Sequence, residues 1–438
     1  MNAMNSPPTD ISRVVRAIQI TGVTLIAVGL SCNEWVLTRL LSKDGMLEPS
    51  TLAAIRSFNL FMFSAGLVSI WFAPSLYARC RRLGQLVRRR PMVAMAIGLL
   101  TMTGAVAVAE AVCGFLDRER GALITEVIGP QPFDVLDPVL GYQPKANAQA
   151  RVILRRKGKT IYDIVYTIDG QHRRVTPGPG LKTGRQFILF FGDSFTFGEG
   201  VNDRETMPSR VASATPGYAV YNYGCRGYGT QQMLARLDQE EIQREVPQQT
   251  GLLIYTFIDA HVERAIGSMR SFTGWAANTP YYALERGELV RKGSFATTRH
   301  PWVNAVYSVL GRSEILKYFR LDIPPVVTPR DLELVCRLID ASRDQFRARF
   351  GSDRFYVVLY PGSHRATAMS QRLQALGITV LDYSRLIDFY GDQRYQIPYD
   401  GHPTPQTHEL IARHLVHDLG LGLPKDRPGA GRFEGQNH

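Results

Sequence analysis

The chain has 438 residues, of which 45% are hydrophobic and 21% are charged, and its formal net charge is +12 at pH 7. This basic excess does not indicate a nucleic-acid partner. Six arginines fall within the short segment 79–90, and the chain contains no zinc-finger or RNA-binding signature. Composition and motifs therefore argue against nucleic-acid binding, and the arginine-rich segment 79–90 explains part of the basic charge.

The first 116 residues have the pattern of a membrane anchor. Three apolar runs, Ile18–Leu37, Phe58–Tyr77 and Met92–Phe115, come close to the ~20 residues that a helix needs to span a bilayer. The first run is not a cleavable signal, because no small-residue cleavage pattern follows it and two further apolar runs come later. Glu110 lies in the third run, where a carboxylate is expected to face other helices, to lie near a boundary or to mark a functional contact. We therefore predict three transmembrane helices.

Arginine residues determine the expected orientation of these helices. The loop 79–90 between the second and third runs holds six arginines and no acidic residue. The positive-inside rule places such a loop in the cytoplasm, so the third helix leaves on the opposite side. We predict a multi-pass protein of the bacterial cytoplasmic (inner) membrane whose remaining chain is periplasmic.

Residues 117–186 are expected to form a strand-rich linker close to the membrane. The linker contains the proline-punctuated stretch Phe133–Asn147 and a strand-like run, Ala150–Thr176, with a turn predicted at Asp169-Gly170. Five of the residues between 151 and 159 are basic. They predict either the solvated face of a hairpin or a surface that contacts anionic lipid head groups or an acidic glycan.

Residues 187–423 alternate strand-like and helical patterns, which predicts an α/β domain with a parallel sheet covered by helices on both faces. The interval 265–329 is predicted to be an insertion with a hairpin over Tyr281–Phe295, and its aromatic residues suit either a lid or substrate wall or a small packed subdomain. Gly, Pro and polar residues over 424–438 predict a disordered tail. The predicted strands are Phe187–Phe191, Ala219–Tyr223, Leu252–Phe257, Phe355–Tyr360 and Thr379–Asp382, and the predicted helices include Arg330–Arg349 and Thr407–Leu419.

The motif Gly192-Asp193-Ser194 directly follows the first of these strands. Glycine allows a sharp turn at the carboxyl end of a strand, where open α/β sheets place their ligands, so Ser194 is a candidate nucleophile. A serine hydroxyl needs a base that takes its proton and a carboxylate that orients the base. Asp400 and His402 supply both groups from one short segment late in the chain.

Together with the loop Asn222–Thr230, these motifs resemble the SGNH (GDSL) hydrolase superfamily, in the form of a membrane-anchored bacterial member. The resemblance covers roughly residues 187–419 and implies a flavodoxin-like three-layer fold with a parallel sheet. It implies that Ser194 is the nucleophile, His402 the general base and Asp400 the acid that orients it. Thr196 stands where the last glycine of an α/β-hydrolase Gly-x-Ser-x-Gly motif would be, which argues against that other family.

The same resemblance implies an oxyanion hole built from N–H donors. Members of the superfamily use the backbone N–H of the nucleophile, here Ser194, and that of a glycine in a second sequence block. In this chain Gly227 aligns best with that glycine, and Gly224 is the next candidate. The third donor of the family is an asparagine side chain in a third block.

This third block departs from the family pattern. It reads Ile258–Arg264 and contains no asparagine, so His261 or Arg264 is expected to take over as the N–H donor. Loss of one such donor typically costs about 10²- to 10³-fold in rate. The candidates for substrate binding are Asp193, Asn222 and Arg264.

No metal or other cofactor is expected, because acyl transfer through a serine triad needs none. His408, His414 and His417 lie along a predicted helix, and a solvated helix face is favoured over a metal site because no matching carboxylate or cysteine cluster accompanies them. Cys225 and Cys336 are the two cysteines in the predicted exported part, and the sequence leaves their pairing open.

The resemblance and the predicted topology lead to one functional expectation with two alternatives. The expected activity is serine ester hydrolysis of acyl esters, with an acylated envelope glycan or lipid as substrate and envelope polysaccharide machinery as a further partner. The first alternative is O-acyltransfer, in which a sugar hydroxyl replaces water at the same triad. The second is a non-catalytic glycan-binding or assembly protein, which the missing asparagine motivates.

Overall fold

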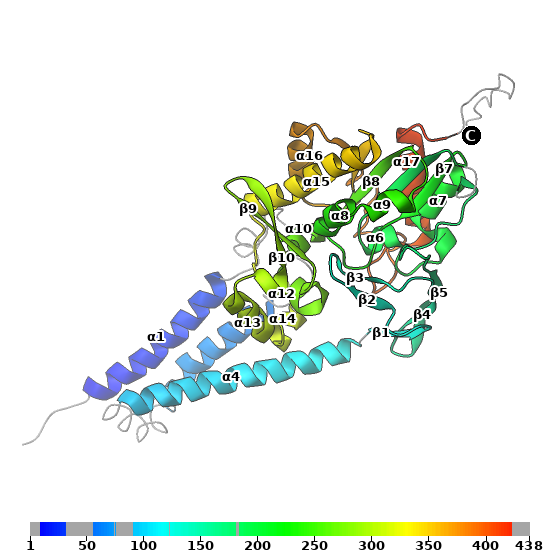
Figure 1. Ribbon diagram of the computed structural model, residues 1–438. Coiled ribbons are helices and arrows are strands. Elements are labelled where there is room, and N and C mark those ends of the chain that lie inside the picture. The colour runs from blue at the N-terminus through cyan, green and yellow to red at the C-terminus, as the bar shows by residue number, and fades with distance from the viewer. Residues whose placement is uncertain are drawn as a thin grey trace, which may run out of the picture. The chain divides into compact units, whose positions relative to one another are not determined.

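The computed structural model describes residues 9–31, 56–73, 75, 91–121, 123–180 and 184–422. The chain divides into two compact units. One unit combines the residues up to Arg120 with the segment Ser308–Val326, and the other holds Gly121–Tyr307 and the residues from Val327 onward. Figure 1 labels the elements of each unit along the chain.

The N-terminal unit consists of helices. They are α1 (Thr9–Ser31), a helix over residues 56–73, α4 (Pro91–Arg120) and the short α14 (Glu314–Tyr318). Within the described ranges, no helix has both the length and the apolarity that a bilayer crossing requires. The predicted runs 18–37 and 58–77 extend beyond the described residues, so the three spanning helices stay a prediction.

Glu110 of α4 faces another helix, as one of the alternatives predicted, and caps the start of α14. Its carboxylate accepts hydrogen bonds from the Ser313 hydroxyl at 2.6 Å and from the backbone N–H groups of Glu314 at 2.5 Å and Ile315 at 3.3 Å. A carboxylate at this position satisfies N–H groups that a helix cannot pair internally. The segment Ser308–Val326, predicted as part of the insertion, is thereby joined to α4.

The second unit begins with antiparallel strands, as expected for the linker. A three-stranded sheet has the order β1-β4-β5, and β2 pairs with β3 in a separate hairpin. The tight turn between β4 and β5 lies at Lys157-Gly158, both with positive φ, and the sequence did not predict it. The predicted turn at Asp169-Gly170 is present after β5, where the His172 N–H donates to the Asp169 carbonyl at 3.3 Å and Ile168 pairs with Arg174. The Asp169 carboxylate also accepts the N–H of Arg173 at 2.9 Å. The bounds are β1 (Leu123–Ile128), β2 (Asp134–Asp137), β3 (Gly141–Pro144), β4 (Gln149–Arg156) and β5 (Lys159–Thr167).

A five-stranded parallel sheet forms the centre of this unit, as predicted. Its order is β12-β11-β8-β6-β7, and every neighbouring pair is parallel. Numbered along the chain, this order is the 2-1-3-4-5 arrangement of flavodoxin-like folds, which confirms the predicted α/β fold with a parallel sheet. The strands are β6 (Gln186–Phe191), β7 (Tyr218–Asn222), β8 (Thr250–Phe257), β11 (Phe355–Leu359) and β12 (Thr379–Asp382).

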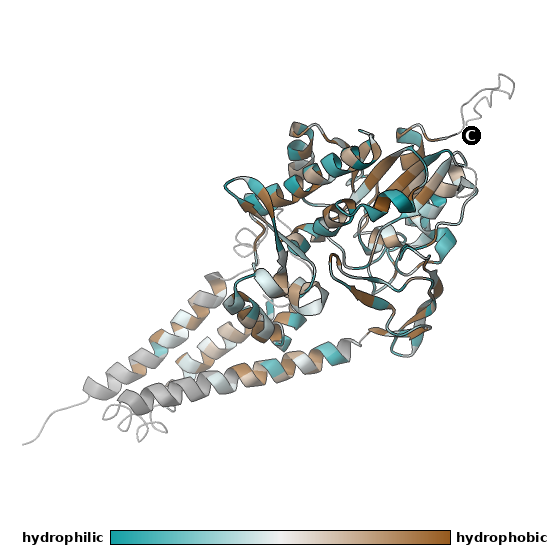
Figure 2. Ribbon diagram, in the orientation of Figure 1, coloured by the Kyte–Doolittle hydropathy of each residue, from teal (hydrophilic) through white to brown (hydrophobic). Residues whose placement is uncertain are grey.

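Alternate residues of β6 face two hydrophobic cores, because side chains of a strand point to opposite faces in turn. Phe187 and Leu189 pack into the core that includes α8 (Thr230–Leu237) and α15 (Pro329–Phe350). Ile188 and Phe190 pack into the opposite core, which includes α7 (Met207–Ala214) and α17 (Pro405–Asp418). Figure 2 shows the central strands coloured mostly hydrophobic between these helices. Both faces of the sheet are therefore covered.

The two long helices of this unit have strong start signals in the sequence. Thr328 caps α15 by accepting the Asp331 N–H, with Pro329 at the first turn. Thr404 caps α17 in the same way, with Pro405 after it. The predicted hairpin of the insertion is also present as β9 (Pro280–Glu285) and β10 (Glu288–Ser294). The remaining elements are α6 (Ser194–Phe197), η1 (Asp203–Glu205), α9 (Glu241–Glu245), α10 (Ala260–Ala265), α11 (Met269–Ser271), η2 (Phe272–Ala276), α12 (Phe295–Thr298), α13 (Pro301–Leu310) and α16 (Ala366–Ala375).

Candidate active site

A tight turn at the carboxyl end of β6 presents Ser194. Gly192 has φ +153°, and a Cβ at this position would lie 2.2 Å from the Thr196 hydroxyl, so a side chain would clash there. Asp193 caps α6 by accepting the Phe195 N–H at 3.0 Å. Ser194 is therefore the first residue of a short helix that starts directly after the strand, as the motif predicts.

The structure brings Ser194, His402 and Asp400 into one hydrogen-bonded chain. The Nε2 atom of His402 lies 2.9 Å from the Ser194 hydroxyl oxygen, and its Nδ1 atom lies 2.9 Å from an Asp400 carboxylate oxygen. With Nδ1 protonated toward Asp400, Nε2 keeps the lone pair that can take the serine proton. The side chains of His402 and Asp400 are 19% and 13% exposed, so the pair is shielded from bulk water but accessible to a ligand.

Asp193 is buried and held by Arg264. Its side chain is 0% exposed, and the Arg264 Nη1 atom lies 2.7 Å from its Oδ2. The same Nη1 donates to the Tyr228 carbonyl at 2.7 Å. Burial raises the pKa of Asp193, but the positive charge of Arg264 outweighs burial and holds the pKa below its usual value. Asp193 is therefore an internal counter-ion, and its predicted role in substrate binding was wrong.

Gly227 is the second-block glycine that reaches the site. It has φ +74°, and a Cβ there would lie 2.6 Å from both Trp275 Nε1 and the Tyr142 hydroxyl. The Trp275 indole N–H donates to the Gly227 carbonyl at 2.9 Å, and the Tyr142 hydroxyl donates to the Arg226 carbonyl at 2.6 Å. These contacts fix the loop, and within the described part of the chain the backbone N–H groups of Gly227 and Ser194 have no acceptor.

Gly224 and Asn222 have structural roles, and their predicted site roles were wrong. The Gly224 N–H donates to the Asn222 side-chain oxygen at 2.9 Å, so this N–H is already occupied. The Asn222 side chain is buried and donates to the Thr196 carbonyl at 3.0 Å. Neither residue lines the pocket that contains Ser194.

His261 also points away from the pocket. It is 0% exposed, and its Nδ1 lies 2.8 Å from the Tyr255 hydroxyl, while its Nε2 lies 3.7 Å from Asp193. Burial lowers the pKa of His261 to about 3, so the ring is neutral at pH 7. The expectation that His261 supplies an oxyanion donor was therefore wrong. Arg264, the other candidate, does line the pocket.

The pocket over Ser194 has a volume of about 550 Å³. Its wall includes Trp275, which lies in the insertion that was predicted as a lid or substrate wall or as a packed subdomain. Residues of the β2–β3 hairpin also line the pocket, and the sequence did not predict that this hairpin contributes to the site. Trp275 is 45% exposed and Leu136 is 81% exposed, so apolar surface is open to a ligand here. The lining residues are Asp134, Leu136, Gly141, Tyr142, Ser194, Glu199, Arg226, Gly227, Arg264, Trp275, Asn278 and His402.

Glu199 is a site residue that the sequence reading missed. Its carboxylate lines the pocket, with Oε2 3.3 Å from His402 Nε2. Burial lowers the pKa of His402, but the charge of Glu199 and the hydrogen bond to Asp400 outweigh burial and raise the pKa to about 9. The position of Glu199 in the sequence could have identified it, because the Gly-Glu-Gly segment that contains it directly follows α6, the short helix that begins at Ser194.

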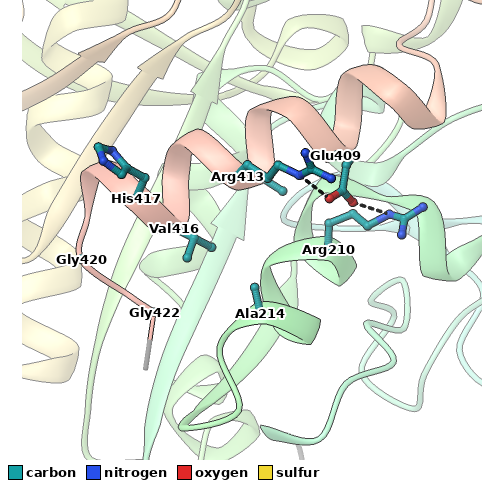
Figure 3. Close-up of a pocket in the computed structure, with 9 residues that line it drawn as sticks. Arg210, Ala214, Glu409, Arg413, Val416, His417, Gly420 and Gly422 are labelled. Atoms are coloured by element: carbon teal, nitrogen blue, oxygen red, sulfur yellow. Dashed lines mark hydrogen bonds and ion pairs between the residues drawn. The ribbon is translucent and has the colours of Figure 1, made fainter. Parts of the chain in front are cut away.

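A second pocket, of about 460 Å³, lies between α7 and α17 and contains none of the predicted catalytic residues. Figure 3 shows Glu409 between Arg210 and Arg413 in this pocket, at 3.2 Å and 2.8 Å. Val416 and Ala412 supply apolar surface. The positive charge of the two arginines in this pocket is therefore partly neutralised by Glu409.

The predicted helical face of histidines is only partly solvated. His417 is exposed, but His408 is buried and its Nδ1 accepts the Met207 N–H at 3.2 Å. Among the residues that the structure describes, no group of histidine, cysteine and carboxylate side chains could hold a metal ion. Cys225 and Cys336 are buried free thiols and do not form a disulfide with each other.

Comparisons with known proteins give distant structural similarity. No protein-family model matches the chain, and no curated protein sequence matches it. A protein of the lipolytic G-D-S-L family from Desulfitobacterium hafniense DCB-2 is 14% identical with a TM-score of 0.31, over 53% of this chain and 98% of that one. An acetyl xylan esterase from the rumen bacterium Butyrivibrio proteoclasticus is 12% identical with a TM-score of 0.28, over 64% of this chain and 79% of that one. The chain is thus distantly similar in structure to a lipolytic protein and to a carbohydrate esterase.

Proposed function

We propose that the chain is a serine ester hydrolase of the SGNH type that cleaves acyl esters through Ser194. The observation that carries this proposal is the chain of two 2.9 Å contacts from Asp400 through His402 to Ser194, inside a pocket that a ligand can enter. A weakly nucleophilic hydroxyl becomes reactive when an oriented imidazole takes its proton. This arrangement also counts against a purely non-catalytic role.

The first half of the reaction acylates Ser194. Nε2 of His402 takes the hydroxyl proton while the serine oxygen attacks the ester carbonyl carbon, and Asp400 stabilises the imidazolium that forms. The tetrahedral intermediate then breaks its bond to the alcohol oxygen, which receives the proton from Nε2. Water repeats these steps on the acyl-enzyme, releases the carboxylic acid and returns the proton to Ser194.

Three groups suit the stabilisation of the oxyanion. The backbone N–H groups of Ser194 and Gly227 have no acceptor within the described part of the chain. Arg264 is the candidate that replaces the missing asparagine, because it lines the pocket and uses its Nη1 atom for both Asp193 and Tyr228. A guanidinium has five N–H donors, so further donors are available to the intermediate.

The wall of the pocket favours an acyl ester carried on a sugar or a lipid. Trp275 presents an open aromatic ring beside the polar groups of the site, and Leu136 adds apolar surface. Aromatic rings with a polar edge suit the faces of sugar rings as well as apolar chains. We infer an acylated envelope glycan or lipid as the substrate class, together with envelope polysaccharide machinery as a partner.

The direct test is ester hydrolysis by the purified full chain. We expect turnover of p-nitrophenyl acetate and of an O-acetylated oligosaccharide by the wild type, and a loss on the order of 10³-fold or more in Ser194→Ala. Ser213→Ala is the matched control, because Ser213 lies on α7 and its hydroxyl only donates to the Ser209 carbonyl. Equal rates in Ser194→Ala and the wild type would refute the proposal. Acetylated acceptor sugar without free acetate would instead identify transfer.

We also propose that the N-terminal helices anchor the chain in the cytoplasmic membrane with the hydrolase unit in the periplasm. The apolar runs and the arginine-rich loop 79–90 support this topology. Alkaline carbonate extraction should leave the chain in the membrane fraction, and protease added to spheroplasts should digest the hydrolase unit. Release by carbonate, or protection of the unit until the membrane is lysed, would contradict it.

A further inference from the structure

Glu199 occupies a position that the triad chemistry leaves unexplained. Its backbone N–H donates to the Ser194 carbonyl at 2.9 Å, which ties it to the helical turn of the nucleophile. Its Oε2 approaches the same ring nitrogen of His402 that faces the serine hydroxyl, at 3.3 Å against 2.9 Å for the serine. The Glu199 side chain is 23% exposed and faces the catalytic pocket, so its charge is only partly screened by water.

The two neighbours of Nε2 require opposite protonation states. Neutral His402 donates Nδ1–H to Asp400 and accepts the serine proton at Nε2, which leaves the Glu199 carboxylate facing a lone pair. Protonated His402 donates from both nitrogens, so Nε2–H can bond to Glu199 while the ring cannot act as a base. The ionised Glu199 carboxylate therefore stabilises the form of His402 that does not activate Ser194.

The other charged groups around His402 do not cancel this effect. Asp400 lies on its own loop and Asp193 on the turn after β6, and both favour the protonated ring. His408 of α17 is also near but is neutral at pH 7, because burial lowers its pKa to about 3. On the far side, the Glu199 charge acts on Arg226, whose own carboxylate partner is Asp134 at 2.5 Å. Two neutral groups also lie nearby: the ring of Phe195 contacts the His402 ring, and the phenol of Tyr162 lies near Asp400 and Glu199.

We propose that Glu199 is a positioning residue that holds His402 as an imidazolium in the empty site, so that Ser194 is activated only after the Nε2 proton leaves. This inference rests on the proposed hydrolase function and concerns the same site. The released proton goes to solvent, after which the Ser194 hydroxyl donates its hydrogen bond to Nε2. A ligand hydroxyl or ammonium that binds the Glu199 carboxylate weakens its hold on the ring and makes that proton easier to lose.

The test is the pH dependence of serine reactivity in the wild type and in Glu199→Gln. Both full-length proteins are treated with a fluorophosphonate probe between pH 6 and pH 10, and the rate of covalent labelling at Ser194 is measured. In Glu199→Gln the acidic limb should shift to lower pH, and labelling at pH 7 should become at least about tenfold faster, since each pKa unit changes the neutral fraction about tenfold. At the alkaline plateau the variant should be equal or slower, because a less basic imidazole is a weaker base.

Faster labelling at pH 7 without faster labelling at the alkaline plateau separates an effect on the His402 pKa from a structural one. Glu126→Gln is the matched control, since Glu126 lies on β1 with its side chain 52% exposed, and it should reproduce the wild-type profile. Glu199→Asp, which keeps the charge but shortens the reach, should fall between the two. A wild type that labels with a profile identical to Glu199→Gln overturns the role of Glu199 and leaves the hydrolase proposal standing. A wild type that labels at no pH overturns the hydrolase proposal and this inference with it.

Discussion

The buried ion pair between Asp193 and Arg264 gives a sharp energetic prediction, because it joins the nucleophile turn to the third sequence block. Among the residues that the structure describes, Arg264 is the cation within 4 Å of the Asp193 carboxylate, whose side chain is 0% exposed, and replacing Arg264 with Met removes it. His261 also lies within 4 Å of this carboxylate but is neutral at pH 7. Breaking a buried pair by removing one partner costs about 3–5 kcal/mol, since the remaining charge has no compensation. We expect Arg264→Met to lower the free energy of unfolding by this amount.

We also expect a second substitution, at Asp193, to restore part of the stability that Arg264→Met loses. Asp193→Asn combined with Arg264→Met leaves no buried charge, so it should be more stable than Arg264→Met alone by at least about 2 kcal/mol. Guanidinium unfolding of the detergent-purified chain at pH 7, followed by tryptophan fluorescence, measures both values. Asp193→Asn alone completes the thermodynamic cycle, which isolates the pair from the loss of the arginine stem.

Lowering the pH tests whether the buried charge of Asp193 causes the loss of stability in Arg264→Met. In the wild type the pKa of Asp193 is lowered, so its contribution to stability is present above the unfolded value of 3.8 and is lost as pH falls below it. In Arg264→Met the charge that opposed burial is gone and the Phe195 N–H hydrogen bond remains, so the pKa of Asp193 should rise, and the deficit should be largest at pH 7 and shrink as the carboxyl protonates. A cost below about 1 kcal/mol, or a deficit that does not change with pH, would show that Asp193 and Arg264 do not form a stabilising buried ion pair.

Four further predictions concern the site. Gly227→Ala should lower ester turnover about tenfold or more and destabilise the fold by about 1–3 kcal/mol, because the new Cβ meets Trp275 at a positive φ; kinetics and denaturation measure the two effects. Asp400→Asn should reduce turnover by on the order of 10⁴-fold with the unfolding midpoint nearly unchanged, since the imidazole loses its orienting charge. Trp275→Ala should raise KM more than it lowers kcat, because the ring is 45% exposed and forms a wall of the pocket; a selective loss of kcat would contradict this role. Finally, His402 has a pKa raised to about 9, so its contribution to stability is complete below the unfolded value of 6.5 and is lost as pH rises through about 9. Denaturation midpoints of the wild type and His402→Ala between pH 6 and pH 10 should converge at alkaline pH.

The sheet and the triad could be predicted from sequence because both depend on local patterns. Buried parallel strands are short apolar runs with clear ends, and all five were predicted within about two residues of the bounds observed. Ser194 and His402 each follow a recognisable turn signal. Their convergence follows from the fold, since the carboxyl ends of parallel strands meet at one edge of the sheet.

The rest of the site depends on long-range packing that no local pattern specifies. Tyr142 reaches Gly227 from the β2–β3 hairpin, which is separated from it in sequence by the strands β4 to β7 and the helices α6 and α7. His261 and Asp193 look like site residues in the sequence, but the fold turns both inward, where Asp193 is neutralised by Arg264. The turn between β4 and β5 was not predicted, because Lys157 adopts a positive φ that is unusual for a lysine.

The most direct measurement is covalent labelling of the full-length protein by a fluorophosphonate probe at pH 9, with mass spectrometry of the labelled peptide. We expect one probe on Ser194, and no labelling in Ser194→Ala or His402→Ala. Ser213→Ala should label as the wild type does. A folded wild type that stays unlabelled, or a probe on a different serine, would contradict the proposal that Asp400 and His402 activate Ser194.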